Sequence, residues 1–582
     1  MKKVVIIRST KKKEEELRKA EPEKSGAVDS SFIKASKNSS KPVENEPIEV
    51  PSPTNEKIKT IDDSDDNPIV EAKKKNPGFK WYYLALFALV FGLLGTLVGC
   101  GTMSPLYAGY SYGVNETDPL FFLYLGFSLN NGSLPYIGIY DQKGMYIFTF
   151  EAVGYALGGK MGVYALLFLY ASIVSFALMM STKKLGGGYL SELLVGVTHM
   201  ALTMAFKYGN HTGDLLMPWV ALSIMFYIFG VMDKKERYFL IGSFFAGLMA
   251  AFGLTSRPTE AIWAVSFVVF YFIYWLRHEK NLNLLWNALI AILGCAIPVG
   301  VYSLMALKGG YFNEMIYATI TQNFSYVGQH VYGVTVVDQV LTAVGAAFCL
   351  ILFFPVKKKH GLDIALFFLV MAILAGGVNI YIARFPHYWL TAIPPFILVL
   401  YLAFAPVDEL SLLPKAKKIY KSVIISLSGA CVVMGVLWPT FYYGMKEPLG
   451  LTNGGEFSST YYENKRTEAA LDKYIKSSPT FEEDTVFGLD GKGAALLYLG
   501  KTSPERFACY TSWQSVDNPK IEPEVLSYLN GPDAPDWIIS TSDQAMHTLS
   551  SFKEILNSDY TKVYDKYDDI YLTIFEANAH RA

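Results

Sequence analysis

Residues 104–144, SPLYAGYSYGVNETDPLFFLYLGFSLNNGSLPYIGIYDQKG, place carboxylates and a lysine directly after the first long apolar segment of the chain. The polar side chains of interest are Asp118, Asp141, Gln142 and Lys143. Ionised groups close to a lipid bilayer lose hydration and are costly unless they are paired. A segment that only joined two helices would not need them, so we expect chemistry at a membrane surface.

The composition is that of a membrane protein. Of the 582 residues, 52% are hydrophobic and 15% aromatic, and the mean hydropathy is +0.25, which is too apolar for a soluble protein. Runs near the ~20 apolar residues that cross ~30 Å of hydrocarbon predict about eleven transmembrane helices. They cover residues 81–101, 161–180, 189–206, 215–232, 238–254, 261–276, 284–307, 336–356, 364–382, 388–405 and 423–443. The expected fold class is therefore an α-helical polytopic membrane protein.

The charges predict how the chain is oriented. The net charge is −1, so no basic field points to nucleic acid as a partner. Lys and Arg gather in alternate loops, and the positive-inside rule then places the N-terminus in the cytosol. The outer loops hold few cations, mainly Lys143, Lys207, Arg257, Lys308 and Arg384. An odd number of spans places the C-terminal region outside.

Three segments are expected along the chain. Residues 1–78 are a mixed-charge, Pro-rich stretch, which predicts a disordered cytosolic tail. Residues 79–443 form the transmembrane domain, and residues 444–582 form an extracytoplasmic α/β domain. In that domain we expect strands at 484–489, 536–540, 561–564 and 570–575, and helices at 465–476 and 523–529.

The first outer loop contains two expected interfacial helices. Residues 118–130, DPLFFLYLGFSLN, predict an amphipathic helix lying on the membrane, with Asp118 as its N-cap before a proline. Asparagines and Gly132 end this helix, and residues 135–144 form an irregular connection. A second helix is expected at 145–157.

This order of features resembles the GT-C superfamily of polytopic glycosyltransferases, which includes protein O-mannosyltransferases, lipid A aminoarabinose transferases and bacterial cell-surface sugar transferases. The match is an acid, a helix closing with NG, then PY, then an acidic-Gln-Lys-Gly turn. In this sequence these are Asp118, Asn131 with Gly132, Pro135 with Tyr136, and Asp141 to Gly144. Weaker matches are Arg257-Pro258-Thr259 and Arg384 to Tyr388. Family members often have Asp two residues after the PY tyrosine, whereas Gly138 stands here, which puts any role of that acid in doubt.

The resemblance implies an inverting transferase whose donor is a sugar on polyprenyl phosphate. Asp118 would be the general base, with Glu116 and Asp141 as further candidate acids. The leaving phosphate accumulates charge and needs cations at a water-poor site. The candidates for this phosphate-binding role are Lys143, Arg257, Arg384 and His387.

Plainer interpretations stand beside these roles. Asp118 can be only a helix cap, and Asp141 only the ion-pair partner of Lys143. Arg257 can be an interfacial anchor, and His387 an ordinary interfacial histidine. The surrounding motif favours the base for Asp118, whereas for Asp141 and His387 the two interpretations weigh equally.

The expected acceptor is a polysaccharide, a teichoic-acid-like polymer or a glycolipid at the outer face of a bacterial plasma membrane. No Walker A loop, Rossmann fingerprint or zinc pattern occurs, so no cofactor or metal site is predicted, although Asp118 with Asp141 leaves a divalent cation open. Two other classes remain. A lipid-linked sugar flippase predicts a repeated hydropathy pattern, and a polysaccharide polymerase or ligase would use a lipid-diphosphate donor.

Overall fold

The structure, a computed structural model, describes residues 78–102, 118–205, 209–278, 283–323, 325, 352–377, 386–404, 466–489, 493–508, 518–540, 550–566 and 572–581. The tail predicted at 1–78, apart from its last residue, lies outside this set. So do the predicted span at 423–443, most of the span at 336–356 and the predicted boundary at 444.

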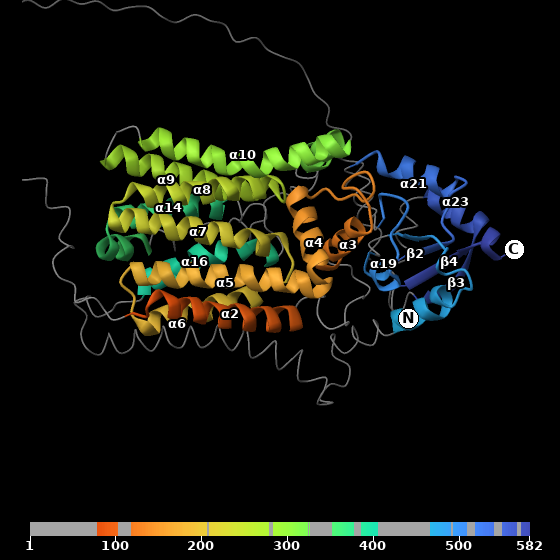
Figure 1. Ribbon diagram of the computed structural model, residues 1–582, viewed down its shortest axis with the longest axis horizontal. Coiled ribbons are helices and arrows are strands. Elements are labelled where there is room, and N and C mark those ends of the chain that lie inside the picture. The colour runs from red at the N-terminus through yellow and green to blue at the C-terminus, as the bar shows by residue number, and fades with distance from the viewer. Residues whose placement is uncertain are drawn as a thin grey trace, which may run out of the picture. The chain divides into compact units, whose positions relative to one another are not determined.

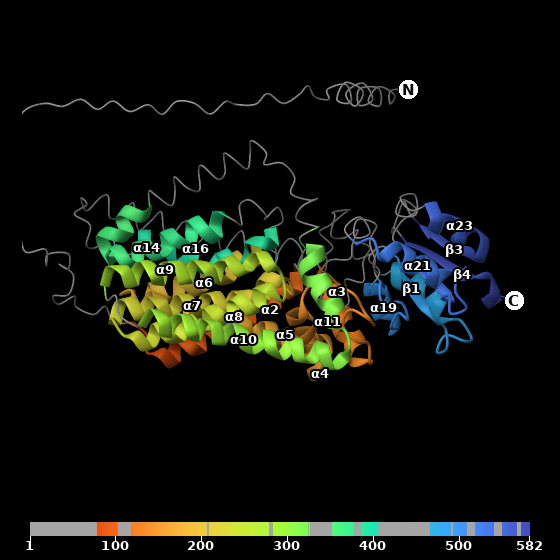
Figure 2. The same ribbon diagram turned by 90° about the horizontal axis from the view of Figure 1, so that it is seen from above.

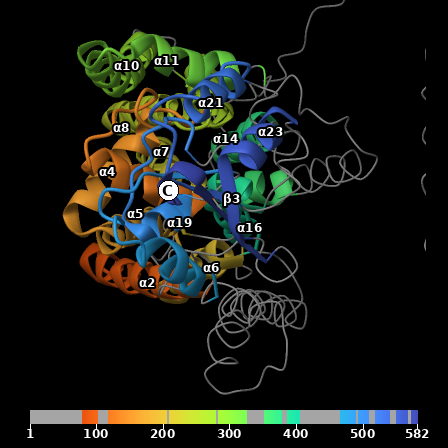
Figure 3. The same ribbon diagram turned by 90° about the vertical axis from the view of Figure 1, so that its right-hand side faces the viewer.

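A row of long helices forms one layer (Figures 1 and 3). In spatial order it contains α2 (Trp81–Thr102), α5 (Lys160–Lys184), α7 (Thr212–Asp233), α8 (Glu236–Leu254) and α10 (Asn283–Gly309), each in contact with the next. The described residues include 5 helices that are long and apolar enough to cross a membrane: α5, α7, α8, α10 and the run Pro258–His278. The chain is therefore mostly helical, with several membrane-length helices.

A second layer covers one face of this row. It contains α6 (Tyr189–Ala205), α16 (Ile393–Phe404), α14 (Leu362–Met371) and α9 (Ile262–His278). α16 contacts α5, α6, α7 and α14, and α14 contacts α9. Figure 2 shows α14 and α16 along one side of the row of long helices. The helices of both layers begin within a few residues of the predicted spans, because long apolar runs are the strongest local signal in a sequence.

Two glycines bring α8 and α10 close together. A Cβ on Gly247 would lie 2.1 Å from the Ala291 carbonyl oxygen, and one on Gly294 would lie 2.4 Å from the Phe244 carbonyl oxygen. Such contact between backbones supplies the van der Waals packing that joins helices in lipid. Other side chains of α10, such as Leu304, are exposed and apolar, as lipid requires.

α3 (Asp118–Asn130) and α4 (Met145–Gly158) cross the ends of the long helices (Figure 1). These are the two helices predicted in the first outer loop, and their bounds agree with the prediction to within a residue. The expected amphipathic character of α3 is wrong, however. Its buried side chains lie all around the helix axis, and it packs against α4 and α19 (Gly493–Leu499). Protein covers the surface that was expected to face lipid and water.

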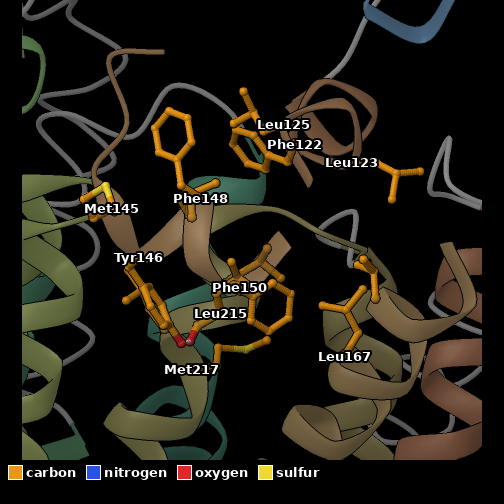
Figure 4. Close-up of a cluster of buried hydrophobic side chains, with 14 of the residues drawn as sticks. Phe122, Leu123, Leu125, Met145, Tyr146, Phe148, Phe150, Leu167, Leu215 and Met217 are labelled. Carbon is orange, nitrogen blue, oxygen red and sulfur yellow. Dashed lines mark hydrogen bonds between the residues drawn. The ribbon is translucent and has the colours of Figure 1, made fainter. Parts of the chain in front are cut away.

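The core beneath α3 and α4 is apolar and aromatic (Figure 4). It joins four helices through Phe122 and Leu125 of α3, Phe148 and Phe150 of α4, Leu167 of α5, and Leu215 and Met217 of α7. Within it the Tyr146 hydroxyl donates a hydrogen bond to the Leu215 carbonyl oxygen at 3.0 Å. Burial on this scale fixes α4 against α7, so the loop between α3 and α4 has a rigid base.

The C-terminal part contains a 4-stranded mixed sheet in the order β1-β2-β4-β3. The strands are β1 (Val486–Gly488), β2 (Trp537–Ser540), β3 (Tyr560–Lys566) and β4 (Leu572–Ala577). β1 pairs with β2 in parallel, and the other pairs are antiparallel. The same part of the chain contains helices α19, α21 (Ile521–Leu529) and α23 (Ser550–Asp559), and a helix over residues 466–471 that continues into the π-helical segment η9 (Asp472–Lys476). The predicted strands and helices of this region are confirmed, with small differences at their ends.

Candidate active site

The loop between α3 and α4 folds back on itself around Tyr136. We call residues 135–144 the acidic turn. Tyr136 has a left-handed backbone with φ 66° and a fully buried side chain. Its N–H donates to the Ile139 carbonyl oxygen at 2.8 Å, and its hydroxyl donates to the Lys143 carbonyl oxygen at 3.0 Å. These bonds give the predicted irregular connection a defined shape.

Gly138 occupies the position where GT-C proteins often carry an aspartate, and the turn leaves no room for a side chain there. A Cβ on Gly138 would lie 2.7 Å from the Leu134 backbone nitrogen. Atoms that close overlap, so any larger residue would have to move the main chain. The local backbone is therefore compatible with glycine at this position and not with an aspartate.

Asp141 lies buried in the acidic turn beside Lys143. Its Oδ1 accepts the Lys143 N–H at 3.2 Å and lies 4.0 Å from the Lys143 ammonium. Burial raises the pKa of Asp141, the Lys143 charge acts to lower it, and the Asp118 charge raises it further. The charge of Asp118 therefore opposes the ionisation of Asp141.

The acidic turn lies against the end of α8. The Tyr146 N–H donates to the Thr255 carbonyl oxygen at 2.9 Å. A Cβ on Gly144 would lie 2.3 Å from the same oxygen, so glycine is needed for this close approach. Arg257 follows Thr255 by two residues. The structure thus brings the segment that carries Lys143 against the segment that carries Arg257.

Glu260 links Arg257 to a third segment. Arg257 forms an ion pair with Glu260, whose carboxylate is buried. Glu260 Oε2 also accepts a hydrogen bond from the Thr391 hydroxyl at 2.8 Å. Thr391 belongs to η5 (Pro386–Ala392), the turn that contains His387. The backbone of this turn is therefore tied to the Arg257 segment.

The structure connects some of the predicted site residues and does not describe others. Asp118, Asp141, Lys143 and Arg257 belong to segments that contact one another, as described above. Glu116, Arg384 and the side chain of His387 lie outside the described residues. Within the part of the chain that the structure describes, no group of 3 or more His, Cys, Asp and Glu residues is placed to hold a metal ion.

Other residues at this site were not predicted. Glu260 stands three residues after Arg257, a spacing that favours an ion pair on one helical turn, and this signal was available in the sequence. Arg506 and Asn518 also bond to the acidic turn. Arg506 lies 370 positions from its partner Tyr136, so no local pattern points to it.

The chain is similar to known proteins in its fold and not in its sequence. No protein-family model matches the sequence, and no curated protein matches it either. Among solved structures, ArnT from Cupriavidus metallidurans bound to undecaprenyl phosphate matches with a TM-score of 0.54 and 14% identity, over 85% of this chain and 98% of the ArnT chain. The apo state of ArnT matches with a TM-score of 0.50 and 12% identity, over 85% and 97% of the two chains. The resemblance suggested by the first loop is thus confirmed at the level of the fold, and the chain has the fold of ArnT, a GT-C aminoarabinose transferase.

Proposed function

We propose that this protein is an inverting glycosyltransferase that moves a sugar from a polyprenyl-phosphate donor to a cell-envelope acceptor at the outer face of a bacterial plasma membrane. One observation carries the proposal. A chain with the ArnT fold has the Asp141 carboxylate beside Lys143, on a turn that lies against the Arg257 segment and follows the helix that begins at Asp118. The ArnT structure contains undecaprenyl phosphate, a lipid phosphate of the kind that the proposed donor would release.

In the proposed reaction Asp118 is the general base. Its carboxylate takes the proton of an acceptor hydroxyl while that oxygen bonds to the anomeric carbon. The bond between the anomeric carbon and the phosphate oxygen breaks, and its electron pair leaves with the polyprenyl phosphate. Attack from the face opposite the phosphate inverts the configuration once. In this scheme Asp141 orients the acceptor or holds Lys143.

Cations stabilise the departing phosphate in this scheme. Lys143 and Arg257 are the candidates whose segments meet, with Arg384 and His387 as further candidates from the sequence. Both side chains of the first pair are largely shielded from water, with exposures of 18% and 12%. Fixed cations in such an environment act more strongly on developing charge than they would in bulk water.

The decisive test compares wild type with Asp118→Asn in transfer from a synthetic polyprenyl-phosphate sugar. Asparagine keeps the size of the side chain but cannot accept the proton, so we expect kcat to fall about 10²- to 10⁴-fold with unchanged melting temperature. Glu116→Gln and Asp141→Asn, made in parallel, locate the base if Asp118→Asn stays active. A matched lipid-diphosphate donor separates this function from a polymerase or ligase, since wild type should turn over only the monophosphate.

A further inference from the structure

The C-terminal part of the chain binds the acidic turn by its main chain. The Tyr140 N–H donates to the Arg506 carbonyl oxygen at 2.8 Å, and Arg506 Nη1 donates to the Tyr136 carbonyl oxygen at 3.1 Å. One residue therefore bonds to both ends of the segment 136–140. The Arg506 side chain is only 12% exposed, so water competes weakly for these bonds.

Two carboxylates fix the Arg506 guanidinium in place. Its Nε and Nη2 donate to the two oxygens of Glu524 at 2.5 and 2.6 Å, and its Nη1 donates to Glu314 at 3.1 Å. Glu314 belongs to α11 (Phe312–Ile316) and Glu524 to α21. Because the guanidinium is planar and is hydrogen-bonded to a carboxylate on two sides, it keeps one orientation. The donor that faces the Tyr136 carbonyl is therefore preorganised.

A second chain of hydrogen bonds runs from the C-terminal part to the residue beside Asp141. The Asn518 amide donates to the Tyr140 hydroxyl at 3.1 Å, and this hydroxyl donates to the Gln322 side chain. Gln322 Nε2 in turn donates to the Gln142 side chain at 3.4 Å. Both routes thus end on the acidic turn, one at Tyr136 and one at Gln142.

The acidic turn needs such outside support. A tyrosine with positive φ is in a sparsely populated conformation that persists only where surrounding bonds hold it. The Tyr136 hydroxyl bonds to the Lys143 carbonyl oxygen, and the Lys143 N–H bonds to Asp141. A displacement of the Tyr136 backbone would therefore also move Lys143 and, through it, Asp141.

We propose that Arg506 is a positioning residue: from the C-terminal part of the chain, it holds the acidic turn in the shape that places Asp141 and Lys143 for sugar transfer. This proposal rests on the proposed function. It assigns the C-terminal part a role inside the reaction cycle, because a displacement of about 1 Å at reacting groups lowers the rate about 100-fold. Arg506 itself does not contact the substrate in this scheme.

The test uses the full-length protein in detergent and measures two properties of Arg506→Gln. Hydrogen exchange of peptides covering residues 133–144 reports on the turn, and we expect about tenfold or faster exchange at the Tyr136 and Tyr140 amides. Sugar transfer reports on the chemistry, and we expect kcat to fall about 10- to 100-fold while the KM for donor changes less than about threefold. Arg506→Lys keeps the positive charge but lacks the planar guanidinium, so its kcat should lie between that of wild type and that of Arg506→Gln.

His580→Gln is the matched control from the same part of the chain. His580 bonds to Asp484 and Glu576, away from the turn, so this variant should leave exchange at 133–144 and kcat unchanged. Asn518→Ala tests the second route without disturbing the ion pairs of Arg506, and Arg506→Lys decides the role of Arg506 if Arg506→Gln does not fold. The proposal is overturned if exchange and kcat in these variants equal those of His580→Gln. If wild type transfers no sugar, the proposed function fails, while the exchange measurements still decide whether the C-terminal part holds the turn.

Discussion

Replacing Glu151 with glutamine should stabilise the protein at neutral and alkaline pH. Glu151 lies in α4 and is fully buried. Burial raises the pKa of Glu151 from its ordinary value of 4.5 to about 8, and the nearby Asn210 amide offsets this only in part. The folded protein therefore keeps a proton on Glu151 at a pH where the unfolded chain has released it.

The sign and size of the effect follow from that difference. Between pH 4.5 and 8 the folded state binds more protons than the unfolded state, so the free energy of unfolding falls as the pH rises. Each pKa unit corresponds to about 1.4 kcal/mol, so the loss between pH 5 and pH 8 is roughly 3 to 4 kcal/mol. A whole domain is stable by only about 5–15 kcal/mol, so this loss is large enough to measure.

Thermal unfolding in detergent at pH 5, 6, 7 and 8 checks this prediction. Wild type and Glu151→Gln should melt at similar temperatures at pH 5, and the variant should melt at a higher temperature at pH 8. Glu483→Gln, which changes an exposed acid, is the control and should follow wild type. Parallel pH curves for wild type and Glu151→Gln would refute the reasoning, because they would mean that Glu151 is ionised in the folded protein.

Three further predictions concern the acidic turn and the C-terminal part. Gly138→Asp should destabilise the protein by roughly 1–3 kcal/mol in thermal unfolding, because a Cβ there meets the Leu134 backbone. Lys143→Gln removes the charge that acts to lower the pKa of Asp141, so an acidic limb of kcat/KM that reports the ionisation of Asp141 should move to higher pH; an unmoved limb would mean that the proposed base Asp118 sets it instead. Burial acts to lower the pKa of His580, but neighbouring carboxylates outweigh it and raise that pKa. The melting temperature of His580→Gln should therefore fall below that of wild type at pH 6 and approach it at pH 9, and an equal deficit at both pH values would contradict this.

Local signals in the sequence were enough to predict the helices. The apolar runs of α5, α7, α8 and α10 are long because a membrane-length helix needs about 20 apolar residues. In the segment between α2 and α4, the Asp-Pro start and the Asn-Gly end predicted the bounds of α3. The short strands of the C-terminal sheet were also predicted, because β1, β2 and β4 are compact apolar runs next to turn residues and β3 contains β-branched and aromatic residues.

Contacts between distant parts of the chain could not be predicted. α3 was expected to lie on the membrane because its sequence was interpreted as amphipathic, but α19, which covers it, comes hundreds of residues later. The same holds for the candidate site. Asp118 and Asp141 were recognised in the sequence because they belong to a local motif. Arg506 could be recognised only in the structure, where it bonds to Tyr136.

The bond between the Ser503 N–H and the Tyr124 hydroxyl, 3.0 Å long, joins residues 379 positions apart. A ribosome adds about 5–20 residues per second, so roughly 20–75 s separate the synthesis of these two residues. During that interval α3 has been synthesised but the segment that covers it has not. The apolar surface of α3 is then exposed, and chaperones would recognise such a surface on the nascent chain. On the proposed role of Arg506, a nascent chain carries the acids of the site before it can use them, and the enzyme becomes competent only near the end of its own translation.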